Sequence, residues 1–130
     1  MADLQSALEV AVFARLDAQM TGATVYQYVP QDVGGSLVML ALFNSTEVGG
    51  KDSDLFRFSF SIATEVNAKT RKDLTALQAQ VLAALGGWKP AATATAVFGD
   101  ITFETADSAQ SQDARTYYGT QNFSVFVQPA

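Results

Sequence analysis

Two pairs of carboxylates have a spacing that could serve acid–base chemistry in this sequence. Asp52 and Asp54 are two residues apart, and Asp100 and Glu104 are four apart. Paired carboxyl groups in a cleft can act as general acid and general base. The first pair falls in a glycine-bearing loop and the second on one face of an expected strand, where contact with solvent explains both more simply. We therefore expect no catalytic residue.

A metal or cofactor site is also not expected. Glu47, Asp52 and Asp54 could offer oxygen ligands to calcium, but their spacing lacks the twelve-residue loop closed by a glutamate. The chain has no histidine and no cysteine, which removes imidazole bases, thiol nucleophiles and most transition-metal sites. The glycine pairs at 34–35, 49–50 and 86–87 are not followed by the Lys-Ser or Lys-Thr of a phosphate loop.

Length and composition predict one soluble globular domain spanning residues 1–130. Apolar residues make up 48% of the 130 and charged residues 16%, which is enough apolar surface for a core. The net charge of -5 has the wrong sign for gripping nucleic acid. The apolar run Leu37–Phe43 is too short to span a membrane, and Met1-Ala2-Asp3 lacks the basic start of a signal peptide, so we expect a protein made in a cytoplasm.

Hydrophobic periodicity predicts two amphipathic helices. The first runs from about residue 3 to 20, capped by Asp3 and followed by Gly22 in a left-handed conformation. The second runs from Asn67 to Leu85 and ends at the glycine pair 86–87. Its apolar stripe comprises Leu74, Leu77, Val81 and Leu85.

Five strands complete the predicted fold. They span residues 25–29, 37–43, 55–64, 94–105 and 115–127, with polar loops at 44–54 and 106–114. In the third, Phe56, Phe58, Phe60 and Ile62 face inward; in the fourth, Val97, Gly99, Ile101 and Phe103 share a face; and in the fifth, Phe123, Val125 and Val127 do. The order α-β-β-β-α-β-β indicates an α+β domain whose mainly antiparallel sheet carries its helices on one face.

Four aromatic residues have no clear inward position. They are Trp88, Tyr117, Tyr118 and Phe126. Exposed aromatic side chains without nearby chemistry are more typical of a protein interface than of a ligand pocket.

The segment Val25-Tyr26-Gln27-Tyr28-Val29-Pro30-Gln31 resembles the opening of the tail terminator family of long-tailed phages, also called tail completion or minor tail protein U-like. The order of the later elements is also similar. This resemblance implies a structural virion protein, usually a hexameric ring, that caps the tail tube, stops its polymerisation and docks the filled head. It implies contacts with the tail tube protein and a head-completion or stopper protein, passage of DNA through the lumen without specific binding, and assembly in the host cytoplasm.

Within that role, two loops are the expected contacts with the tube or a neighbouring subunit. Their charged residues are Glu47, Lys51, Asp52 and Asp54 in the first loop, and Asp107, Asp113 and Arg115 in the second. We expect the basic cluster of Lys69, Arg71 and Lys72 to meet acids such as Asp107 or Asp113 of the next subunit, head to tail; a solvated helix face is the simpler explanation of that cluster.

Two other functions fit the same features. The chain could be another ring component of a phage neck or tail, such as a head-completion or tube protein. It could also be a small enzyme or ligand-binding α+β domain with a pocket between sheet and helices, although the missing histidine and cysteine disfavour this.

Overall fold

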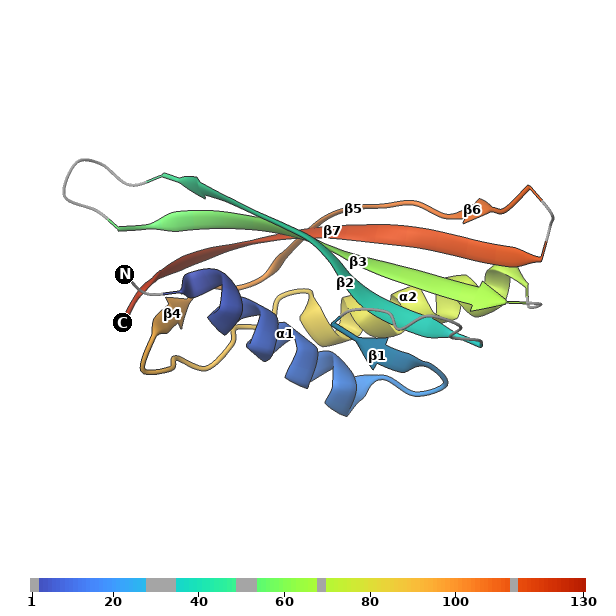
Figure 1. The fold of residues 1–130 in the computed structure, drawn as a ribbon, viewed down its shortest axis with the longest axis horizontal. Coiled ribbons are helices and arrows are strands. Elements are labelled where there is room, and N and C mark those ends of the chain that lie inside the picture. The colour runs from blue at the N-terminus through green and yellow to red at the C-terminus, as the bar shows by residue number, and fades with distance from the viewer. Residues whose placement is uncertain (1–2, 28–34, 49–53, 68–69, 113–114) are drawn as a thin grey trace.

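A strongly twisted sheet lies over two helices, as Figure 1 shows. The computed structural model describes residues 3–27, 35–48, 54–67, 70–112 and 115–130. In these ranges the elements follow the order α1, β1, β2, β3, α2, β4, β5, β6 and β7. This confirms the predicted α+β class, and no helix in the described ranges is long and apolar enough to cross a membrane.

Helix α1 spans Leu4–Gln19 and confirms the first predicted helix. Asp3 caps it, because its side chain accepts a hydrogen bond from the backbone N–H of Ser6. The buried residues recur every four positions and turn one face to the core: Leu4, Leu8, Val12 and Leu16. Gly22 follows with a φ of 83°, the left-handed conformation that the sequence predicts.

Helix α2 spans Arg71–Leu85 and begins later than the predicted Asn67. Thr70 and Asp73 form a capping box, in which each side chain accepts from the backbone N–H of the other. Asn67 instead ends strand β3 and pairs with Thr116. The predicted apolar stripe is confirmed, because its four residues are buried: Leu74, Leu77, Val81 and Leu85.

The first three strands are β1 at Thr24–Tyr26, β2 at Leu37–Glu47 and β3 at Phe56–Asn67. β1 runs parallel to β2, and β2 runs antiparallel to β3. The prediction of a loop from Asn44 was wrong, because β2 continues to Glu47, which pairs with Phe56. Backbone hydrogen bonds to β3 hold this segment in a strand even though its side chains are polar. Residues 28–31 of the resemblance segment lie outside the described residues.

The long strand β7, Thr116–Pro129, pairs on one side with β3 and on the other with three short strands. These are β4 at Ala96–Phe98, β5 at Thr102–Ala106 and β6 at Ala109–Gln110. The prediction of one continuous strand over 94–105 was therefore wrong. The prediction of a loop over 106–114 was also wrong, because β6 lies within it. The chain turns inward between β4 and β5, where the Gly99 N–H donates to the Phe126 carbonyl and the Ile101 N–H to that of Trp88.

One hydrophobic core lies between the sheet and both helices, which cover the same face of the sheet as predicted (Figure 1). Of the residues predicted to face inward on β3, Phe58, Phe60 and Ile62 are buried, and Phe56 is partly buried against the core. The β7 residues that were expected to share a face are buried too: Phe123, Val125 and Val127. The prediction that alternate residues from Val97 to Phe103 share one inward face was wrong. Phe98 and Ile101 are buried, whereas Phe103 is 38% exposed.

Candidate interaction site

The paired ends of β2 and β3 form an arm at one end of the sheet, here defined as residues 43–48 and 54–58. The register of β2 against β3 shifts between Leu40 and Phe43, where the arm begins. The arm reaches beyond the first turn of α1 (Figure 1), and residues 44–48 are exposed. Because residues 44–48 contribute little to the core, this part of the arm is available for contacts with another chain.

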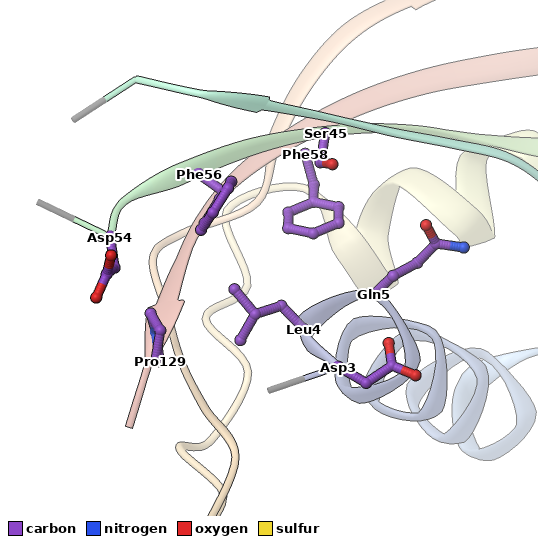
Figure 2. Close-up of a pocket in the computed structure, with 8 residues that line it drawn as sticks. All are labelled: Asp3, Leu4, Gln5, Ser45, Asp54, Phe56, Phe58 and Pro129. Carbon is purple, nitrogen blue, oxygen red and sulfur yellow. The ribbon is translucent and has the colours of Figure 1, made fainter. Parts of the chain in front are cut away.

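A groove lies beneath this arm, between the arm, the start of α1 and the end of β7. Its volume is about 480 Å³. Figure 2 shows Leu4, Phe56 and Phe58 turned toward the same space, with Pro129 at its side. The polar residues of the lining are Asp3, Gln5, Ser45 and Asp54. We call this feature the arm groove.

Carboxylates surround the apolar lining of the arm groove. Asp3 and Asp54 line it, and Glu47 lies beside it because it pairs with Phe56 across the arm. Hydrogen bonds from the backbone N–H and the hydroxyl of Ser6 lower the pKa of Asp3 below its ordinary value. Among the described residues, the charged side chains that line the groove are the carboxylates of Asp3 and Asp54.

Basic residues lie at the opposite end of the sheet, where α2 begins and β7 starts. β7 connects the two ends, since Thr116 pairs with Asn67 near α2 and Pro129 lines the arm groove. Lys72 is exposed in the first turn of α2. Arg71 has partners within the chain, because its guanidinium donates to the Ser108 hydroxyl at 2.8 Å and stacks over the Tyr117 ring at 5.5 Å.

Asp107 is also held within the chain, close to Arg71. Its backbone N–H donates to the Thr120 carbonyl at 3.0 Å, and its carboxylate accepts from the Thr120 N–H at 2.9 Å. Its carbonyl accepts from the Gln78 amide at 2.9 Å. These bonds fasten the corner between β5 and β6 to both β7 and α2. Arg71 binds Ser108, which follows Asp107 in the sequence. The basic residue Arg71 and the acidic residue Asp107, which were predicted to pair between subunits, therefore lie on the same surface of one chain.

The sheet face turned away from the helices carries a polar stripe across β3, β7 and β5. Ser61 donates to the Asn122 carbonyl oxygen at 2.6 Å, and the Asn122 amide donates to the Thr105 hydroxyl at 2.7 Å. Arg57 forms an ion pair of 3.2 Å with Glu104. Ser124 donates to the same Glu104 carboxylate. Apolar side chains flank this stripe: Leu42, Tyr118 and Phe126 are 55%, 47% and 48% exposed.

The two carboxylate pairs considered for catalysis are not brought together as pairs in the described part of the chain. Asp100 lies exposed in the turn before β5, not on a strand, whereas Glu104 is engaged by Arg57 and Ser124. Asp54 lines the arm groove, and its predicted neighbour Asp52 lies outside the described residues. No three acidic side chains of the described residues gather as a metal site.

The predicted contact residues divide between the two ends of the molecule. Glu47 and Asp54 lie on the arm; Asp107, Arg115, Arg71 and Lys72 lie at the opposite end. Lys51, Lys69 and Asp113 lie outside the described residues. The groove residues Leu4 and Pro129 were not predicted as site residues, because only the fold brings the two ends of the sequence beneath the arm.

Among the four unassigned aromatics, two are partly buried and two are exposed. Trp88 and Tyr117 pack against the core, and cations cover both rings: Arg15 lies 5.0 Å from the Trp88 ring centre, and Arg71 covers Tyr117. Tyr118 and Phe126 remain on the uncovered sheet face, where an interface was predicted.

Comparison with known proteins identifies the family. A family model described as tail completion protein gp17 matches residues 10–128, which is nearly the whole chain. The chain belongs to the tail completion family. This confirms the family resemblance predicted from the sequence. Membership makes the chain a structural protein of a virion tail, and its partners are therefore associated with that tail.

The fold agrees with this assignment. The chain superposes on one in a solved structure titled "Virion of native gene transfer agent (GTA) particle" with a TM-score of 0.84. The alignment covers 97% of this chain and 98% of the other at 22% sequence identity, so the likeness is one of fold. A comparison with curated proteins finds no match.

Proposed function

We propose that copies of this chain form a closed ring that caps the end of a tail tube, stops its polymerisation and offers the surface on which the filled head docks. Each copy is a single domain of residues 1–130, and the family resemblance implies six copies. The observation that carries the proposal is the family match over residues 10–128. The partners are further copies, the tail tube protein and a head-completion or stopper protein. The ring works by binding, without catalysis.

The arm is the part we propose meets the tube or a neighbour. Residues 44–48 of the arm are exposed. The proposed contact residues are Glu47 and Asp54 on the arm, together with Lys51 and Asp52 between its two strands. The second contact is the corner around β6, with Asp107, Asp113 and Arg115. Hydrogen bonds to Thr120 and Gln78 hold Asp107 in one geometry at this corner. Contacts on rigid elements cost less ordering entropy when the partner binds.

The net charge of -5 supports passage of DNA through the ring without specific binding. Like charges repel over about a Debye length, roughly 8 Å at physiological salt. A lumen with this sign keeps the phosphate backbone from adhering to the wall while the genome moves through it.

Growth of tail tubes in the presence of this chain tests the capping proposal. Purified tube protein is assembled with the wild-type chain, with a variant lacking residues Glu47–Asp52, and with no addition, and tube lengths are measured by electron microscopy. The wild-type chain is expected to shorten the tubes, and the deletion variant is expected to leave them long while keeping its circular dichroism spectrum.

Three other results would correct this account. Normal capping by the deletion variant would remove the arm from the contact. Unrestricted growth with the wild-type chain would remove the capping function. Open-ended polymerisation of the chain on its own would indicate a tube subunit instead.

A further inference from the structure

We propose that the arm groove is the socket into which the start of α2 from a second copy inserts, with Lys72 as the side chain that enters it. The inference rests on the proposed ring and names the contact that closes it. The socket consists of the apolar residues Leu4, Phe56 and Phe58, with the carboxylates of Asp3, Glu47 and Asp54 around them.

The chemistry of the groove selects a long amphipathic cation. The lysine stem is a chain of four methylene groups that covers apolar surface, while its ammonium group stays near charge or water. An apolar lining with carboxylates beside it offers a partner for each part of that side chain. The carboxylates of Asp3 and Asp54 in the lining disfavour an acidic segment, because like charges across an interface are unfavourable.

The position of Lys72 at the start of α2 is electrostatically unfavourable for a cation. Lys72 is exposed in the first turn of α2, where the helix dipole disfavours a cation. Arg71 in the same turn is held by Ser108 and Tyr117, so it is fixed beside Lys72. Carboxylates from another copy would offset the unfavourable dipole, which gives the lysine a role that the described part of its own chain does not supply.

The geometry suits a ring rather than a two-fold dimer. The groove and the start of α2 lie at opposite ends of β7 (Figure 1), so a single chain cannot join them. A surface that binds a different surface of the next copy makes a head-to-tail contact, which closes into a ring when the rotation allows. The predicted pairing of Arg71 with Asp107 would join two groups that already share one surface, so the groove supplies the better acidic partner.

Cysteine cross-linking tests this contact cleanly, because the chain contains no cysteine. The double variant Asp54→Cys, Lys72→Cys is oxidised at concentrations that give closed assemblies, with tail tubes present if the free chain does not assemble. A ladder of covalent oligomers ending at the ring is expected on a non-reducing gel. The matched control replaces the groove position with Asp17→Cys, which is exposed near the other end of α1 and is expected to give no ladder.

Exchanging the charges at positions 54 and 72 provides a second, independent test of the contact. Lys72→Glu is expected to raise the concentration needed for assembly by roughly tenfold or more, and adding Asp54→Lys is expected to restore assembly. Lys72→Glu places an acid at a helix start, which favours the helix, so a folding defect does not explain a loss.

The outcomes separate this contact from the ring itself. Closed rings without cross-links between positions 54 and 72, or rings unaffected by Lys72→Glu, would overturn the groove contact and leave the ring standing. No closed assembly with or without tubes would overturn the ring, and the contact with it.

Discussion

A buried polar cluster between α2 and β7 shows how single residues fix the corner between β5 and β6, which is the second contact that we propose. The Gln121 side-chain amide donates to the Gln78 carbonyl at 2.9 Å, and the Gln78 amide reaches the carbonyl of Asp107. Gly119 lies beneath these groups, because a Cβ there would collide with the Asp107 carbonyl and the Gln78 amide. The absence of a side chain at residue 119 is therefore what lets the β5–β6 corner approach β7.

Gly119→Ala is predicted to lower the free energy of unfolding by about 1–3 kcal/mol, the usual cost of overpacking. Urea denaturation measures this difference. Gly99→Ala is the matched control, because a Cβ at residue 99 meets the Phe126 carbonyl at an ordinary 3.5 Å. Equal stability of the two variants would contradict the close approach at Gly119.

The cap at Asp3 links stability to pH at one residue. Its pKa is lowered from an ordinary 3.8 by the hydrogen bonds from Ser6. The charged form is favoured in the folded state, so the stabilisation is present above pH 3.8 and is lost as pH falls through the lowered value.

Asp3→Ala is therefore predicted to reduce Tm near neutral pH, with a difference from wild type that shrinks as the solution is acidified below pH 3.8. Thermal melts across a pH series measure it. Asp3→Asn is the control, because an asparagine can cap the helix without titrating. A Tm difference for Asp3→Ala that stays constant down to the lowest pH would contradict the link.

At the scale of elements, the capping box decides where α2 begins. Thr70→Ala is predicted to lower the free energy of unfolding by about 1 kcal/mol, since the Asp73 N–H loses its side-chain acceptor and Asp73 loses its bond to the Thr70 hydroxyl. Thr75→Ala serves as the control, because Thr75 is exposed in the same helix and its hydroxyl donates to the Lys72 carbonyl. Chemical denaturation of both variants measures the difference, and a larger loss for Thr75→Ala would show that the box does not hold the helix start.

The helices could be predicted from the sequence because their apolar residues repeat at helical spacing, but the start of α2 could not. The apolar stripe from Leu74 to Leu85 is a local pattern. The end of β3 depends on a distant partner, since Asn67 pairs with Thr116 and accepts a hydrogen bond from its hydroxyl at 2.8 Å. A strand that gains such a partner extends past the point where its own residues favour a helix.

The strands could be predicted from the sequence where alternate residues pack into the core. The prediction failed at the edge of the sheet. Phe58, Phe60 and Ile62 alternate along a central strand. The segment 96–110 divides into three short strands because each piece meets a different part of β7, which only the assembled sheet reveals. Glu47, Asp54 and Lys72 were named from the sequence, whereas Asp3 was predicted only as a helix cap. The groove itself required Leu4 and Pro129 from distant segments.

At the scale of the whole molecule, charge is distributed along the long axis. Carboxylates surround the arm groove, and Lys72 lies at the opposite end, where α2 starts. A groove at one end that accepts Lys72 from the other end of the next copy makes a head-to-tail contact, which closes into a ring when the rotation allows. This asymmetry is what connects the fold of one chain to the ring that we propose.

The most direct test of the capping function is the dependence of tube elongation on the ratio of this chain to tube ends. Growing tubes receive increasing amounts of the chain, and elongation is followed by light scattering and electron microscopy at a constant excess of tube protein. Capping predicts that elongation stops once each end has received one ring, far below stoichiometry with the tube protein. Elongation that slows only in proportion to the tube protein bound, or that continues unchanged, would contradict the account.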